Sequence, residues 1–112
     1  MTNLENKEKL IEAVDNYDVY STQGRAILKT LIAAAKEDYT VQLSVSSLSD
    51  LSKVSRQGIY NSMGYLEENN LVTRSKIKGK RLSTFILNKD ELDKIVDYYD
   101  NLVRTKSFLK RI

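Results

Sequence analysis

The polar residues between positions 55 and 61 are the first whose types and spacing match a definite chemistry. They supply a guanidinium, amides and hydroxyls, and no acid interrupts them before Glu67. A guanidinium donates two parallel hydrogen bonds to guanine, and a Gln or Asn amide pairs in the same way with adenine. On one helix face these groups predict the reading of base edges, and an ordinary solvated face is the alternative. The candidates are Ser55, Arg56, Gln57, Tyr60 and Asn61.

A second group of side chains concentrates positive charge. Residues 72–88 include five bases and no acid, whereas residues 1–20 include five acids and two bases. A short segment of one charge sign suits a polyanion such as a phosphate backbone. A solvated hairpin is the alternative interpretation. The bases are Arg74, Lys76, Lys78, Lys80 and Arg81.

The sequence lacks the residue types on which most catalysis and metal binding depend. It contains no Cys and no His. The thiol nucleophile, the commonest general base and the usual zinc ligands are therefore missing. Most acids fall at predicted helix starts or on polar helix faces. We expect no enzyme activity, no cofactor and no metal site.

The overall composition is typical of a single globular domain. The chain has 112 residues, of which 41% are hydrophobic and 29% are charged, and we expect one domain over residues 1–112. It has no apolar run long enough for a membrane span and no charged-then-apolar start of the kind that signal peptides have. We therefore expect a cytoplasmic protein without a membrane partner.

Helical spacing of apolar residues predicts the elements at the ends and in the middle of the chain. A first helix is predicted over residues 2–16 and a central core helix over residues 22–37. A last helix is predicted to begin after Asn88, which forms a capping box with Glu91.

Two helices in quick succession are predicted to carry the polar candidates. Ser47 and Asp50 form a capping box for a short helix that ends at Lys53. Ser55 is a natural N-cap for a second helix that reaches about Asn69. This second helix would bury a stripe made of Ile59, Met63 and Leu66.

Strand-like alternation predicts a β-hairpin that carries the basic group. Residues 71–78 and 81–87 alternate in polarity on either side of Gly79, and residues 39–45 form a further short run of the same kind. The basic residues would then lie along one strand and at the tip of the hairpin. Such a hairpin is a second surface that could contact a phosphate backbone.

The predicted last helix carries an apolar stripe that resembles a coiled-coil seam. It could pack on the protein's own core, on the first helix or on a second copy of the chain. A second copy is attractive because one helix and one hairpin make a small interface for a nucleic acid. We expect a homodimer that uses Leu92, Ile95, Val96, Tyr99, Leu102 and Val103.

The segment from Leu48 to Leu87 resembles the winged helix-turn-helix fold of small MarR-like and ArsR-like regulators. The matching residues are Leu48 and Leu51, Val54 and Ser55 at the turn, Ile59 and Tyr60, and the run Leu66-Glu67-Glu68-Asn69-Asn70-Leu71-Val72. Asn70 stands where this family usually has glycine, and Asn tolerates the left-handed conformation that the position requires.

The resemblance implies a mainly α fold with a small antiparallel β-hairpin wing (α+β), with extra helices at both ends. An N-terminal helix would occupy residues 1–20, a winged-helix core residues 22–87 and a C-terminal helix residues 88–112. The second helix of the motif would enter the major groove of double-stranded DNA, and the wing would contact the backbone or minor groove.

The function implied by the resemblance is site-specific DNA binding by a transcriptional regulator. One alternative is an accessory factor of a plasmid or other mobile element that binds a replication, partition or conjugative transfer origin within a larger nucleoprotein complex with a protein partner. The sequence has no evident sensor of metals or thiols, which fits this alternative. Another is a winged helix that binds protein, because the fold serves both tasks.

Two glycines inside the predicted recognition helix need a physical reason. Glycine in a helix costs about 1 kcal/mol relative to alanine. Gly58 therefore predicts a close approach, either to the preceding helix or to a DNA backbone, and Gly64 raises the same question.

Overall fold

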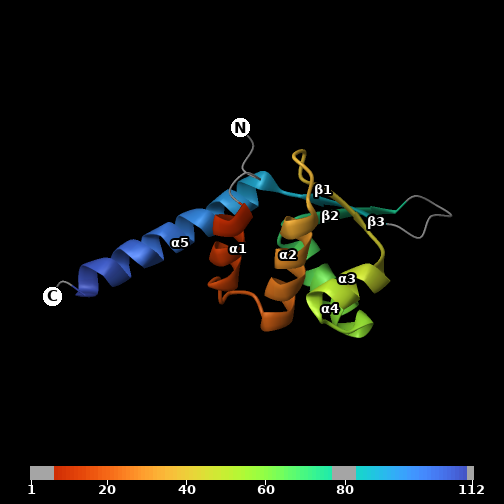
Figure 1. The fold of residues 1–112 in the computed structure, drawn as a ribbon, viewed down its shortest axis with the longest axis horizontal. Coiled ribbons are helices and arrows are strands. Elements are labelled where there is room, and N and C mark those ends of the chain that lie inside the picture. The colour runs from red at the N-terminus through yellow and green to blue at the C-terminus, as the bar shows by residue number, and fades with distance from the viewer. Residues whose placement is uncertain (1–6, 77–82, 111–112) are drawn as a thin grey trace.

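In the computed structural model, residues 7–76 and 83–110 are described, and helices surround a small sheet (Figure 1). This order confirms the predicted fold class, mainly α with an antiparallel β-hairpin between a helix-turn-helix and a terminal helix. The elements are α1 (Lys7–Asp15), α2 (Thr22–Ala34), β1 (Thr40–Leu43), α3 (Val45–Ser52), α4 (Arg56–Glu68), β2 (Val72–Lys76), β3 (Ser83–Leu87) and α5 (Lys89–Lys110).

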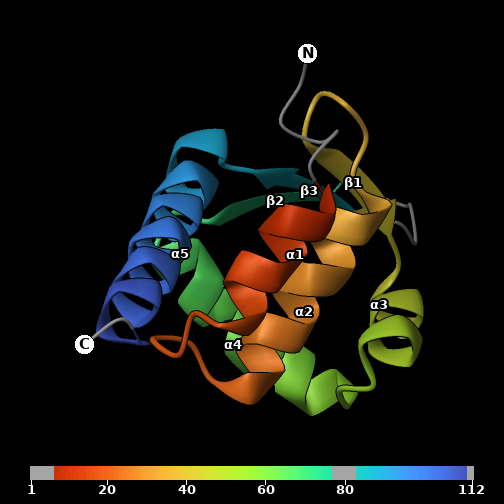
Figure 2. The same ribbon diagram turned by 60° about the vertical axis from the view of Figure 1, so that its left-hand side comes forward.

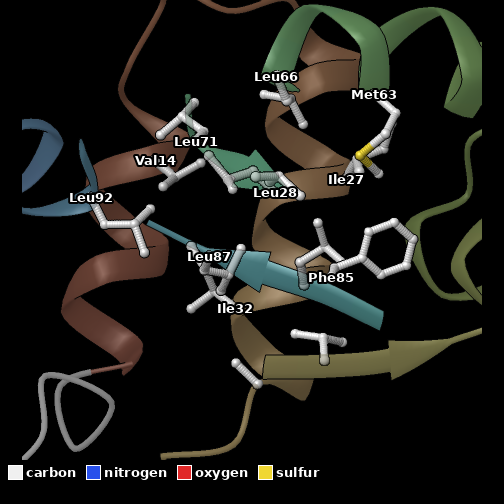
Figure 3. Packing of buried hydrophobic residues seen from close by; sticks show 14 of the residues in the cluster. Val14, Ile27, Leu28, Ile32, Met63, Leu66, Leu71, Phe85, Leu87 and Leu92 are labelled. Carbon is white, nitrogen blue, oxygen red and sulfur yellow. The ribbon is translucent and has the colours of Figure 1, made fainter. Parts of the chain in front are cut away.

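The helix α2 forms the centre of the hydrophobic core. Its side chains Ile27, Leu28, Leu31 and Ile32 are fully buried. The helix packs against α1, α3 and α4, and Figure 3 shows side chains from α1, α4, β3 and the start of α5 gathered around it. Burying one such side chain stabilises the fold by about 1.5–3 kcal/mol. The position of α4 is therefore set mainly by its packing on α2.

The three described strands form one antiparallel sheet in the order β1-β3-β2. Val41 of β1 and Arg74 of β2 both lie opposite Phe85 of β3. Val41 and Phe85 are buried, whereas Arg74 is exposed. The sheet thus covers one side of the core, and its β2–β3 hairpin, which we call the wing, carries polar side chains outward.

Two predicted boundaries around α2 and β1 differ from the observed ones. The helix ends at Ala34 and not near residue 37, because Ala35 takes an extended conformation. The ammonium group of Lys7 donates hydrogen bonds to the carbonyl oxygens of Ala33 at 3.1 Å and of Ala35 at 2.8 Å. This cation therefore satisfies carbonyl groups that the end of a helix leaves without partners.

The first helix of the helix-turn-helix starts earlier than the capping pattern predicts. Its N-cap is Ser44, whose hydroxyl oxygen accepts a hydrogen bond from the backbone N–H of Ser47. The prediction that Ser47 opens this helix is therefore wrong. The helix ends as predicted at Lys53, which takes a left-handed conformation with φ 62°.

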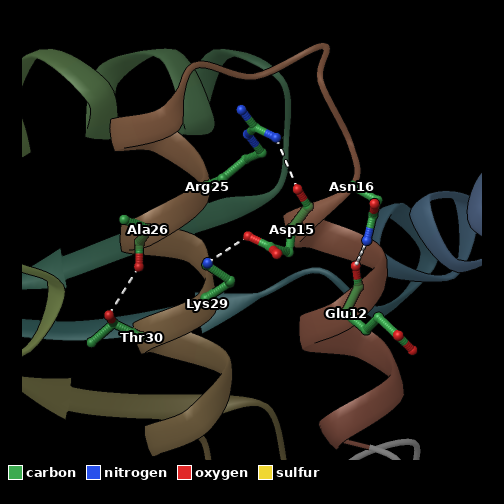
Figure 4. A network of polar contacts seen from close by, with 7 residues as sticks. All are labelled: Glu12, Asp15, Asn16, Arg25, Ala26, Lys29 and Thr30. Carbon is green, nitrogen blue, oxygen red and sulfur yellow. Dashed lines mark hydrogen bonds and ion pairs between the residues drawn. The ribbon is translucent and has the colours of Figure 1, made fainter.

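Polar contacts hold α1 against α2 (Figure 4). The ammonium group of Lys29 lies 2.7 Å from a carboxylate oxygen of Asp15, and the guanidinium of Arg25 donates to the backbone carbonyl of Asp15 at 2.8 Å. The hydrogen bond and the charge of Lys29 hold the pKa of Asp15 below its usual range. Since Asp15 is the last residue of α1, these contacts fix the end of that helix beside α2.

The last helix begins as predicted and extends far beyond the core. The side-chain oxygen of Asn88 accepts hydrogen bonds from the backbone N–H groups of Asp90 and Glu91. From there α5 continues for 22 residues, and its C-terminal half projects away from the other elements (Figure 1). None of the helices among the described residues has the length and apolar character that crossing a membrane requires.

Candidate nucleic-acid interface

The helix α4 has one buried face and one exposed face. Ser55 caps its N-terminus, where the hydroxyl oxygen accepts a hydrogen bond from the backbone N–H of Gly58 at 3.1 Å. The predicted stripe of Ile59, Met63 and Leu66 is buried in the core. The capping and the apolar spacing thus place the intervening polar side chains on the opposite, exposed face.

The exposed face presents the predicted base-reading side chains together. Ser55, Arg56, Gln57, Tyr60 and Asn61 are all exposed, and 54% of Tyr60 is accessible. Within the part of the chain that the structure describes, the guanidinium of Arg56 makes no ion pair or hydrogen bond. The hydroxyl oxygen of Ser55 is already occupied as the helix cap, so this residue contributes first to the shape of the helix.

The amides of Gln57 and Asn61 form a pair on this face. The side-chain nitrogen of Gln57 donates a hydrogen bond to the side-chain oxygen of Asn61 at 3.1 Å. The Gln57 oxygen and the Asn61 nitrogen are left to face outward as one acceptor and one donor. The pair therefore offers complementary groups of the kind that an adenine edge requires.

The turn before α4 is fixed by side chains of α3. The hydroxyl of Ser49 donates a hydrogen bond of 2.6 Å to the carbonyl oxygen of Val54, and Val54 itself is buried. The first turn of α4 contains no acid. Because a helix N-terminus carries a partial positive charge, this end of α4 can face an anion without opposition from its own first turn.

Gly58 is required by protein packing at the start of α4. A Cβ atom placed on Gly58 would lie 2.7 Å from the Cγ1 atom of Val54 and 3.1 Å from the side-chain oxygen of Gln23. The close approach is therefore to the preceding turn and to α2. Gly64 differs, because a Cβ atom there would meet no atom within 4 Å.

The structure describes only part of the predicted basic wing. Arg74 is exposed on β2, and Lys76 is the last residue of that strand, paired with Ser83 of β3. The side chain of Lys76 and the residues Lys78, Lys80 and Arg81 lie outside the described part. The β2–β3 register nevertheless confirms that residues 77–82 connect the two strands of a hairpin.

Two exposed residues beside the N-terminus of α4 are absent from the sequence-based set. Lys53 ends α3 and precedes α4 by a short turn, and its basic side chain could have been identified from this place in the motif. Gln23 at the start of α2 lies against Gly58. Its proximity depends on the packing of two helices, for which the sequence carries no local signal.

The apolar stripe of α5 is divided between the core and the surface. Leu92 and Ile95 are buried in the core, and Val96 and Tyr99 are partly buried against it. Leu102 is half-buried, and 45% of Val103 is exposed. Leu92 and Ile95 are therefore occupied by the protein's own packing, and a second copy could reach mainly the C-terminal part of the stripe.

Comparisons with known proteins identify similar structures but no similar sequences. No family model and no curated protein matches the chain. YusO of Bacillus subtilis matches with a TM-score of 0.55 and 21% identity over 93% of this chain and 67% of YusO. AbsC of Streptomyces coelicolor, a MarR family transcriptional regulator, matches with a TM-score of 0.54 and 14% identity over 95% of this chain and 70% of AbsC.

A third similar structure is MepR, a transcription regulator of the Staphylococcus aureus multidrug efflux pump MepA. It matches with a TM-score of 0.55 and 16% identity over 96% of this chain and 76% of MepR. Similarity at these identities establishes a shared fold. The chain has the winged helix fold found in MarR family regulators, as the sequence resemblance implies.

The two glycines of α4 provide a test of how the helix is positioned. We expect Gly58→Ala to lower the free energy of unfolding by about 1–3 kcal/mol, because its methyl group would overlap with Val54. Gly64→Ala is the matched control and should raise that free energy by up to about 1 kcal/mol, because the site is open. Chemical denaturation measures both values, and equal stability of the two variants would contradict the packing described.

Proposed function

We propose that the protein is a non-enzymatic, site-specific binder of double-stranded DNA that regulates transcription. The observation that carries the proposal is the exposed, acid-free face of α4 that begins at its capped N-terminus. The side chains on it are those that hydrogen-bond to base edges. The rigid packing of the opposite face on α2 gives them a fixed place from which to read a sequence.

In this proposal, α4 enters the major groove with its N-terminal turns foremost. Arg56 pairs with a guanine, and the coupled amides of Gln57 and Asn61 face an adenine edge. Lys53 and the N-terminus of α4 lie where a phosphate would pass. The wing, through Arg74, Lys76, Lys78, Lys80 and Arg81, contacts the backbone or minor groove and supplies affinity with little sequence information.

One similar structure supports double-stranded DNA as the partner. A complex of S. aureus MepR with DNA matches this chain with a TM-score of 0.50 and 19% identity, over 96% of this chain and 88% of MepR. The shared fold makes the same mode of docking available to this chain. Whether α4 is used for it depends on the exposed residues described above.

We also propose that the protein binds DNA as a homodimer through α5. Val103 is exposed on the part of α5 that projects from the body (Figure 1), and Leu102 beside it is only half-buried. The exposed carboxylates Glu8 and Glu12 of α1 are opposite in charge to the bases near the C-terminus. Two copies would pair these surfaces and present two recognition helices to adjacent half-sites.

Selection of bound fragments from the source genome tests the function directly. We expect enrichment of a discrete repeated site, and titration of that duplex at about 50 mM and 200 mM salt should show a steep loss of affinity. Sites at promoters would support transcriptional regulation, and sites at a replication, partition or transfer origin would assign the mobile-element role instead. Absence of enrichment and of salt-sensitive binding would contradict DNA binding and favour a protein partner.

Variants of α4 and of the wing should fail in different ways. Arg56→Ala or Gln57→Ala should relax the preference at one base pair by roughly 1–3 kcal/mol. The double variant Lys78→Ala with Lys80→Ala should weaken binding to every sequence and reduce the log–log salt slope by about one unit per lost contact. Lys36→Ala, which removes an exposed base outside both surfaces, is the control, and wild-type binding by all variants would contradict the docking proposed.

The dimer interface is tested by placing a charge on the exposed end of the stripe. We expect Val103→Glu to shift the sedimentation coefficient to that of a monomer while thermal unfolding stays near wild type, because Val103 is outside the core cluster. Asn101→Glu adds the same charge at an exposed position outside the stripe and should leave the dimer intact. A dimer in both variants would place the interface elsewhere.

A further inference from the structure

Four tyrosine rings connect α5 to α4 by direct contacts. The ring centroids of Tyr98 on α5 and Tyr17 lie 5.1 Å apart, those of Tyr17 and Tyr20 lie 5.3 Å apart, and those of Tyr20 and Tyr65 on α4 lie 5.5 Å apart. The first and last of these contacts are edge-on, at 83° and 78°. All three distances fall in the favourable range of about 4.5–7 Å for aromatic pairs. We call these residues the tyrosine chain.

The tyrosine chain joins two parts of the fold whose main packing partners differ. The helix α4 packs chiefly on α2, α3 and β2, whereas α5 packs chiefly on α1. Tyr17 and Tyr20 belong to the connection between α1 and α2, which runs between α5 and α4 in Figure 2. The rings therefore provide a short physical route from the terminal helix to the recognition helix.

The middle of the tyrosine chain is held in place by the core. Tyr20 is buried, and Tyr17 is partly buried against the same cluster. Burial, followed by the effects of Tyr17 and Tyr65, raises the pKa of Tyr20 to about 12, so its ring stays uncharged at neutral pH. A fixed neutral centre can transmit a displacement of one outer ring to the other.

The outer rings lie at the surface. Tyr98 is 41% exposed and Tyr65 is 46% exposed, so neither is a main contributor to core burial. Tyr65 lies one helical turn beyond Asn61 on α4. A movement of the Tyr65 ring would consequently tilt the part of α4 that carries the base-reading side chains.

We propose that the tyrosine chain is a positioning element that holds α4 in a set orientation relative to α5. Tyr98 then acts on DNA affinity from a helix that carries none of the base-reading residues. This inference extends the proposed function, since the affinity for DNA is its consequence. The orientation of α4 in the free protein is a separate property that exists whether or not DNA is the ligand.

The first experiment uses the free protein, so that it does not depend on DNA binding. NMR spectra of Tyr98→Leu, which removes the ring, are compared with those of Tyr98→Phe, which keeps it. We expect shifts of the Tyr65 ring and of α4 amides in the Leu variant only, and their disappearance when Tyr17→Leu breaks the chain in the middle. Shifts that stop at Tyr17 would overturn the proposal.

The second experiment measures affinity for the selected duplex. Loss of one aromatic contact should lower the affinity of Tyr98→Leu roughly twofold to tenfold, with an unchanged salt slope because no phosphate contact is lost. Tyr98→Phe should bind like wild type. In a Tyr17→Leu background, Tyr98→Leu should have no further effect.

The controls separate the tyrosine chain from its rivals. An equal affinity loss from Tyr98→Leu in both backgrounds would overturn the proposal and assign Tyr98 to another contact, such as a dimer interface seen by sedimentation. Tyr65→Leu, whose ring is largely exposed, replaces Tyr17→Leu if thermal unfolding shows that the latter does not fold. Failure of the wild type to bind any duplex would contradict the proposed function alone, and the NMR comparison would still decide the positioning role.

Discussion

The packing of α4 against α2 is the contact on which the candidate interface depends. Gly58 allows the first turn of α4 to lie against Val54 and Gln23 without a methyl group in between. From that point the buried stripe of α4 continues into the core around α2. Because one face of α4 is fixed in this way, the other face has a definite direction. A side chain can read a base only when its backbone is held so firmly.

Most of the fold was predictable because local physical rules agree with the tertiary structure. The stripe of α4, the cap at Ser55 and the cap at Asn88 follow from residue types at helical spacing, and the structure confirms them. The errors occur at element ends. The end of α2 is determined by an extended residue and by Lys7 from a distant helix. The start of α3 is set by Ser44, although Ser47 has the same chemistry and is only three residues away.

The candidate site was predictable to the extent that it lies on one element. The polar residues of α4 share an exposed face because helical periodicity requires it. Contacts between elements, such as Gln23 against Gly58 or Tyr20 against Tyr65, leave no mark on the spacing of either segment. The stripe of α5 has the same limitation. Its spacing indicates an apolar face, yet only the structure separates Leu92 and Ile95 in the core from Val103 at the surface.

The central claim is that α4 and the wing together form the DNA-binding surface, and chemical-shift mapping tests it most directly. Backbone amide spectra are recorded as the selected duplex is added to the isotope-labelled protein, alongside a scrambled duplex of equal length. The largest changes specific to the selected duplex should fall on residues 53–65, with smaller changes on the wing for both duplexes. Changes confined to α1 and α5, with α4 unaffected, would contradict the claim.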